Sequence, residues 1–180
     1  MKTKTLRLLA LASAGVALLL VIQVGASYVK LRSLDHHLPL VVASVSPREG
    51  WVSGRMIEFE LRRRISNGEF DGAMVLLDIA STASSDDLRD RAKQRAEWLI
   101  GGLVDAGATT ASSLHHAIGG NDAAAVKFLL RLGADPNLKV GAEGESQMDA
   151  FEYAQFAQSA FPDREMLEVL EALNSPESAK

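Results

Sequence analysis

The stretch Ser112–Asn137 constrains the fold of this chain more than any other. It reads S-S-L-H-H-A-I-G-G-N-D-A-A-A-V-K-F-L-L-R-L-G-A-D-P-N. In each half, apolar residues recur at spacings of three and four, which is typical of two short amphipathic helices. We expect Ser112 to cap the first helix. The G-G-N-D segment separates the two helices, and Gly133 followed by Pro136 ends the second. The stretch therefore predicts a helix pair.

This helix pair resembles an ankyrin repeat. The segment S-S-L-H-H-A stands in the place of the ankyrin pattern T-P-L-H-x-A. The segment V-K-F-L-L-R-L-G-A-D-P-N stands in the place of V-V-x-x-L-L-x-x-G-A-D-x-N, with no gap between the two matches. A single ankyrin unit cannot bury its own apolar face. The resemblance therefore implies that neighbouring repeats exist.

Three weaker units are predicted around this one. Residues 57–80 align with the helix pair, except that Arg64 stands where the pattern has a small residue and the Gly-Ala-Asp ending is missing. Residues 84–110 form a second unit, in which 86–105 is as consistent with one helix as with two. Residues 138–173 form the fourth, with a long loop over 139–147. The expected fold is all-α, an ankyrin-repeat helical solenoid of about four degenerate repeats over residues 57–173.

Residues 1–30 are predicted to be a membrane segment. Lys2, Lys4 and Arg7 precede Leu8–Val29, a run of 22 residues without a charge. About 20 apolar residues span a bilayer as a helix, and a basic N-terminus stays in the cytoplasm. The first prediction is a single-pass anchor in a bacterial inner membrane, with the repeats in the periplasm. The alternative is a signal peptide that is cleaved near Ala26, which leaves a soluble periplasmic protein.

The two remaining segments flank the repeats. Residues 31–56 are predicted to be a connector and N-terminal cap, with a short strand or extended arm over Leu38–Val45. Residues 174–180 are predicted to be a disordered tail. The chain has no cysteine, which excludes disulfides and thiolate sites. Residues 31–180 hold 15 basic and 23 acidic residues, so nucleic acid is not an expected partner.

No constellation for catalysis is visible, and we predict a protein that is not an enzyme. The chain lacks the Gly-x-Ser-x-Gly, Walker and dinucleotide motifs. His115 matches the histidine of the ankyrin pattern, which implies structural hydrogen bonding, and His116 is expected to face solvent. The pair His36-His37 does not make a chelate by itself. We therefore expect no catalytic residue, no metal, no cofactor and no small-molecule substrate.

One basic cluster has two interpretations. Arg62-Arg63-Arg64 spreads around a helix, so a solvated and partly capping role is the simpler interpretation. In the alternative interpretation, these arginines bind an acidic partner together with Arg55.

The resemblance implies a protein-interaction module, which binds a protein partner through its concave surface and loop tips. Two narrower hypotheses stay open. One is an immunity or inhibitor protein that neutralises an exported effector, since an acidic body complements a basic effector. The other is an envelope scaffold or stress protein. Contact with the membrane is expected through residues 8–29. The residues predicted to bind the partner are Ser66, Asn67, Gly119, Gly120, Glu145, Ser146 and Met148.

Overall fold

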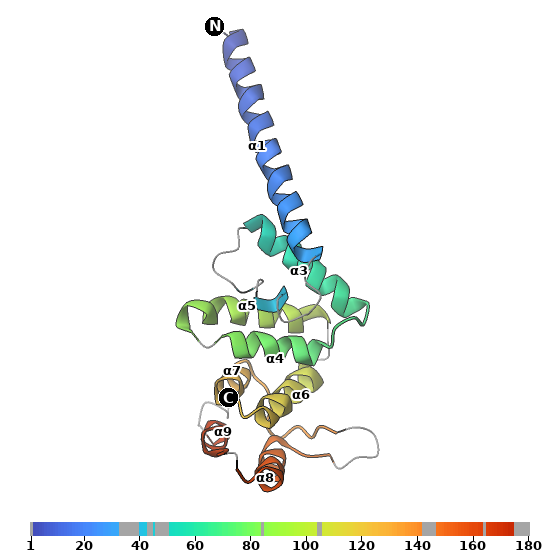
Figure 1. Ribbon diagram of the computed structural model, residues 1–180, viewed down its shortest axis with the longest axis vertical. Helices are drawn as coiled ribbons and strands as arrows, with labels where there is room; N and C mark the ends of the chain where they lie inside the picture. The colour runs from blue at the N-terminus through green and yellow to red at the C-terminus, as the bar shows by residue number, and fades with distance from the viewer. Residues whose placement is uncertain are drawn as a thin grey trace.

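The chain is helical over most of what the structure, a computed structural model, describes. The described residues are 2–32, 40–42, 45, 51–83, 85–103, 106–141, 147–163 and 165–174. They include no strand, and one isolated antiparallel bridge joins Val140 to Met148. The predicted all-α class is confirmed. The named helices (Figure 1) are α1 Lys2–Arg32, α3 Trp51–Ser66, α4 Gly72–Thr82, α5 Asp86–Leu103, α6 Ala106–Gly119, α7 Ala123–Arg131, α8 Ala150–Ala160 and α9 Leu167–Leu173.

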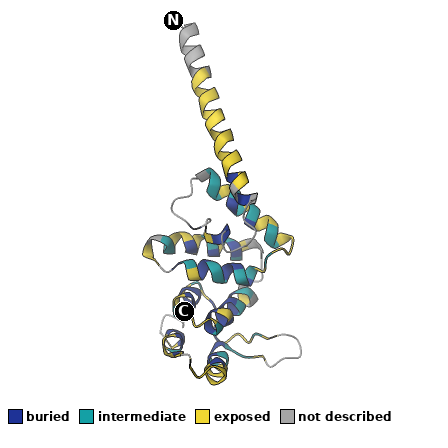
Figure 2. Ribbon diagram, in the orientation of Figure 1, coloured by how far each residue is buried: buried dark blue, intermediate teal, exposed yellow. Residues whose placement is uncertain are grey.

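Helix α1 projects from the rest of the molecule with its apolar surface exposed (Figure 2). Its stretch Leu11–Val29 is long and apolar enough to cross a membrane. The predicted apolar N-terminal helix is therefore present, and its length and composition suit a signal sequence as well as an anchor. At its C-terminal end it packs on α3. Ser27 and Leu31 are buried there, and Ser27 Oγ lies 2.6 Å from Ser53 Oγ.

The predicted connector takes part in the hydrophobic core. Leu40, Val41 and Val45 are fully buried. Residues 40–42 are helical, so the predicted strand or extended arm is wrong at these positions; the β-branched composition suggested a strand, but burial among helices decides the outcome. Helix α3 begins at Trp51 and continues to Ser66. One helix therefore crosses the predicted boundary between the connector and the first repeat.

Residues 57–80 do not form the expected packed helix pair. Helix α3 packs against α1 and α5, whereas α4 packs against α5, α6 and α7. Position 64 offers a physical reason. In α6 the equivalent residue is Ala117, which is buried, but Arg64 needs a polar partner and finds it in Glu60, with Nε 2.7 Å from Oε1. A guanidinium group at this position obstructs the close helix contact that alanine permits.

Residues 86–103 form one helix, α5, which resolves the choice between one helix and two. Ala92, Ala96 and Leu99 are fully buried at spacings of four and three. A single apolar face therefore runs along the helix, without a Gly or Asn turn to interrupt it.

The C-terminal half is a stack of two helix pairs. Helix α6 packs on α7, and α8 packs on α9; between the pairs, α6 contacts α8 and α7 contacts α9. The predicted turn between α6 and α7 is present, with Asn121 at φ 56° and the Asp122 side chain accepting a hydrogen bond from Ala125 N. Gly133 has φ 100°, as its predicted role in ending α7 requires. Asp149 and Glu152 form a capping box at the start of α8.

The predicted start of α6 is wrong. The helix begins at Ala106 rather than after Ser112, and residues 106–111 form its first turns. Ser113 is buried, and its Oγ donates a hydrogen bond to Ala73 O of α4 at 2.8 Å or to Thr109 O at 2.8 Å. Ser113 thus lies inside the helix and contacts α4, which is distant in the sequence. The local capping preference of serine predicted instead that the helix starts here.

Candidate interaction surface

The loop after α7 returns to the stack through a short hairpin. Val140 N donates to Met148 O at 2.9 Å, and Met148 N donates to Val140 O at 3.1 Å. Pro136 O accepts from Ala150 N at 2.9 Å, which closes the connection onto the first turn of α8. The hairpin therefore has a fixed base beside α6 and α8.

His115 ties this hairpin to α6. Its Nδ1 lies 2.8 Å from Ala111 O, and its Nε2 lies 3.0 Å from Met148 O. The side chain is buried, with its ring centroid 5.1 Å from that of Tyr153. The predicted structural hydrogen bonding of His115 is confirmed, and the neighbouring His116 is exposed as predicted.

A groove runs beside the hairpin across α6 and α8. It consists of two adjoining cavities of about 440 and 540 Å³, which share Met148 and Phe156. Phe156 is 52% exposed, so an aromatic face is open to solvent there. We call this the hairpin groove. Its lining residues are Ser112, His115, His116, Lys139, Val140, Gly141, Gln147, Met148, Glu152, Tyr153, Gln155, Phe156 and Ser159.

One ion pair lies at the edge of the hairpin groove. Lys139 Nζ is 3.1 Å from Glu152 Oε2. The hydrogen bond from Asp149 N, followed by that from Lys139, lowers the pKa of Glu152. The groove therefore combines the apolar side chains of Val140, Met148 and Phe156 with a charged edge.

The residues predicted to bind a partner do not share one surface. Met148 lines both cavities of the hairpin groove. Gly119 lies beside it at the end of α6, where a Cβ atom would come 3.0 Å from Tyr153 Oη. Gly120 is exposed in the turn that follows. Ser66 and Asn67 are exposed at the turn between α3 and α4 and line neither cavity, and Glu145 and Ser146 lie outside the described residues.

Sequence reasoning missed the aromatic part of this groove. Tyr153 and Phe156 stand three residues apart on α8, a spacing that fits the core face of a helix, and neither is among the residues predicted to bind a partner. The buried positions of α8 are instead Ala150, Ala154 and Ala157. The useful signal was the row of alanines at spacings of four and three, which leaves the large aromatics beside the core face rather than on it.

Metal binding has no visible support in the described part of the chain, where no group of three or more His, Asp or Glu side chains is placed to hold an ion. The pair His36-His37 lies outside the described residues.

Comparison with protein-family models, with curated proteins and with solved structures gives no match for this chain.

Proposed function

We propose that this protein is a non-catalytic protein-interaction module that α1 holds at a membrane. The observation that carries the proposal is the hairpin groove, where an exposed phenylalanine and a methionine lie between two stacked helices and a hairpin with a fixed base. Aromatic and methionine side chains are enriched in protein interfaces. The groove also has room for several side chains of a partner.

The ankyrin resemblance supports this use of the groove. The pairs α6–α7 and α8–α9 stack first helix on first helix and second on second. A hairpin joins the two pairs, and the histidine of the ankyrin-like segment hydrogen-bonds to that hairpin. In the proposal these pairs are two ankyrin units, α3 to α5 are diverged helices that cover one end of the stack, and the groove is part of the concave face.

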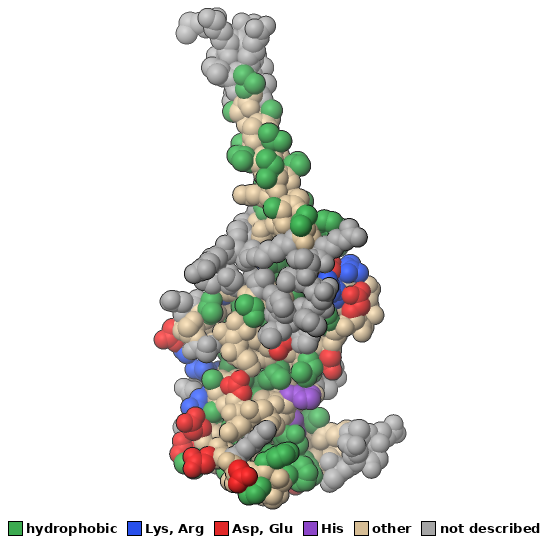
Figure 3. All heavy atoms as spheres, in the orientation of Figure 1, with side chains coloured by type: hydrophobic (Ala, Val, Ile, Leu, Met, Phe, Trp, Pro, Cys, Tyr) green, Lys and Arg blue, Asp and Glu red, His purple; other side chains and the backbone are tan. Residues whose placement is uncertain are grey.

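The acidic charge of the domain favours a basic partner. Acidic side chains gather over the end of the molecule that carries α8 and α9 (Figure 3), where Glu165, Glu168 and Glu171 are exposed. Such a field accelerates association with a cationic protein at low salt. This charge supports the immunity or inhibitor hypothesis over the general envelope scaffold.

The binding test is a crosslinking capture from intact cells with the full-length chain as bait. Phe156→Ser should reduce the yield of a specific partner at least fivefold. Phe161→Ser is the matched control, because Phe161 has the same type and nearly the same exposure, 53% against 52%, and lines neither cavity of the groove. If both variants retain the partner, or no specific partner is enriched by the wild type, the proposed use of the groove fails.

The localisation test uses the absence of cysteine from the chain. Gln158→Cys introduces a single thiol at an exposed position of α8. A maleimide that does not cross the inner membrane should label it in cells with a permeabilised outer membrane. Labelling only after lysis would place the domain in the cytoplasm and contradict the proposal. The mass of the mature chain distinguishes an intact anchor from cleavage near Ala26.

A further inference from the structure

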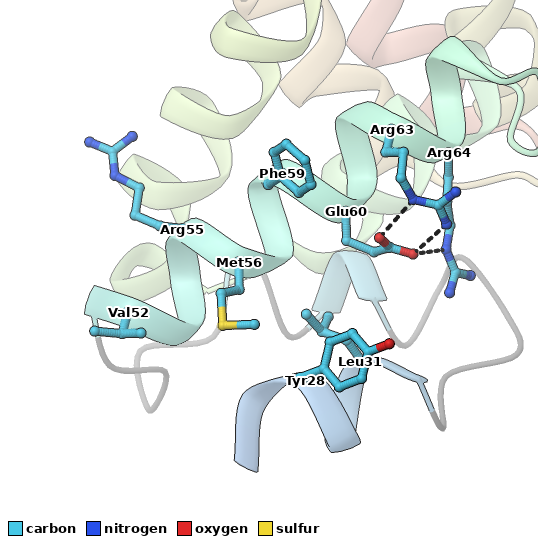
Figure 4. A pocket seen from close by; sticks show the side chains of 9 residues that line it. All are labelled: Tyr28, Leu31, Val52, Arg55, Met56, Phe59, Glu60, Arg63 and Arg64. Carbon is cyan, nitrogen blue, oxygen red and sulfur yellow. Dashed lines mark hydrogen bonds and ion pairs between the residues drawn. The ribbon is translucent and has the colours of Figure 1, made fainter. Parts of the chain in front are cut away.

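A further cavity lies where α1 meets α3 (Figure 4). Its volume is about 820 Å³. Met56 of α3 points toward Tyr28 and Leu31 of α1, and the carboxylate of Glu60 faces the guanidinium groups of Arg63 and Arg64. We call this space the α1–α3 cleft. Its lining residues are Tyr28, Leu31, Val52, Arg55, Met56, Phe59, Glu60, Arg63 and Arg64.

The cleft opens at the end of the apolar span. Tyr28 belongs to the stretch Leu11–Val29 that is able to cross a membrane, and Leu31 follows Val29 by two residues, or ~3 Å along the helix. Tyrosine is enriched at the level of lipid headgroups. When α1 spans a bilayer, the α1–α3 cleft therefore faces the headgroup region, and the exposed side chain of Phe59 lies nearby on α3.

The cleft is basic in a domain that is otherwise acidic. Its lining includes three arginines and one glutamate. Arg63 Nη2 and Arg64 Nε lie 2.8 Å and 2.7 Å from Glu60 Oε1, so two guanidinium groups share one carboxylate. The side chain of Arg55 is 69% exposed at the other end of the cleft, although it also contacts Glu58. Arg63 also pairs with Glu69, and Arg95 shares Glu58 with Arg55. One positive charge remains once all these pairs are counted, because four arginines face three glutamates: Arg55, Arg63, Arg64 and Arg95 against Glu58, Glu60 and Glu69.

An apolar floor with arginines on its rim matches the chemistry of one ligand class. A phospholipid places acyl and glycerol carbons next to a phosphate, and arginine binds phosphate oxygens in a bidentate manner. We propose that the α1–α3 cleft binds an anionic phospholipid of the bilayer that holds α1, with the acyl and glycerol carbons against Met56 and Phe59 and the phosphate at Arg63, while Arg55 adds positive charge at the other end of the cleft. This inference rests on the membrane anchor of the proposed function.

Two features favour a lipid over other occupants. The cleft is continuous with the exposed apolar surface of α1, so a lipid beside the helix reaches it without leaving the bilayer. Its charge is opposite to that of an anionic headgroup, whereas most of the domain repels such a surface. A second copy of the chain would instead bring its own arginines to the same rim.

The test is native mass spectrometry of the full-length protein released from nanodiscs that contain equal amounts of phosphatidylglycerol and phosphatidylethanolamine. The wild type should retain phosphatidylglycerol preferentially. The double variant Arg63→Gln/Arg64→Gln should lower this preference by roughly tenfold. The matched control, Lys127→Gln/Arg131→Gln, removes the same charge from exposed positions of α7 and should leave the preference unchanged.

A second variant guards against misfolding. Arg55→Gln alters an exposed side chain and should lower the preference severalfold without a change in the circular dichroism spectrum. Equal retention of the two lipids by the wild type, or an unchanged preference in both arginine variants, would overturn the inference. So would a dimer that carries no lipid. A separate experiment tests the anchor: membranes are washed with alkaline carbonate, and release of the chain would show that α1 does not anchor it.

Discussion

Replacement of His115 by alanine should loosen the hairpin and destabilise the stack. The ring is 8% exposed. In the variant, Met148 O still accepts a hydrogen bond from Val140 N, and Ala111 O still accepts one from the backbone N–H of residue 115 within the helix. The loss is therefore up to two ordinary hydrogen bonds, about 1 kcal/mol each, rather than two unpaired buried carbonyls. The lost ring contact and the void add about 1 kcal/mol, so we expect about 2–3 kcal/mol in total.

Two measurements check this value on the full-length protein in detergent micelles. Thermal unfolding followed by circular dichroism gives the stability, and hydrogen exchange gives the protection of the Val140 and Met148 amides. His116→Ala is the control, since that side chain is exposed and adjacent. The reasoning is refuted if the two variants lose equal stability, or if His115→Ala leaves the exchange of both hairpin amides unchanged.

Four further substitutions test a buried side chain, an ion pair and two helical glycines. Leu129→Asp puts a charge at a position with 0% exposure; it should cost about 4 kcal/mol or more and abolish a cooperative melt. Hydrogen bonds from Arg63 and Arg64 lower the pKa of Glu60 to about 2, although burial opposes this shift. The stabilising contribution of Glu60 is therefore full above the usual carboxyl range and is lost as the pH falls toward 2. Glu60→Gln should remove that acid dependence from melts recorded between pH 2 and 5. Gly101→Ala should stabilise α5 by about 0.5–1 kcal/mol, because nothing lies within 4 Å of the added methyl group. Gly119→Ala should not stabilise α6, because its methyl would lie 3.0 Å from Tyr153 Oη; equal gains in both melts would contradict this.

The features predicted correctly from the sequence are those that neighbouring residues determine. The turn between α6 and α7 follows from Asn121 and Asp122, whose backbone angle and cap need no distant partner. The end of α7 at Gly133 likewise belongs to one short stretch that has a strong pattern. The hydrogen bonding of His115 is the exception, because its Nε2 reaches Met148 O, 33 residues along the chain, and only the resemblance to the ankyrin pattern predicted it. Turn and cap residues of this kind determine the local backbone conformation, so they can be interpreted without knowledge of distant contacts.

The features predicted wrongly depend on contacts across the chain. The serines at the start of the ankyrin-like segment look like a helix cap, yet Ser113 faces Ala73 of α4 and lies inside α6. The sequence over 57–80 contains two good helices, but it does not state that α3 packs on α1. Arg64 was visible as a departure from the repeat pattern, and its effect on helix pairing became clear only with Glu60 placed beside it.

The candidate surface was only partly predictable for a related reason. The ankyrin resemblance identifies loop tips as a class, and Met148 does line the hairpin groove. The resemblance does not show which of the turns between helices lie on the same side of the molecule. Ser66 and Asn67 were therefore grouped with residues from another part of the molecule. Exposure of Phe156 depends on how α8 is rotated on α6, which the helical period alone leaves open.

The unbroken passage of α1 into its contact with α3 has a consequence for reach. Ser27 and Leu31 lock the last turns of the apolar helix to the domain, so these elements are joined by packing rather than by a flexible tether. The α8–α9 end, which carries the hairpin groove, is the end farthest from α1 (Figure 1). In the proposed function, this rigid joint holds the hairpin groove at one distance from the bilayer. A partner would then have to reach that distance as well as fit the groove.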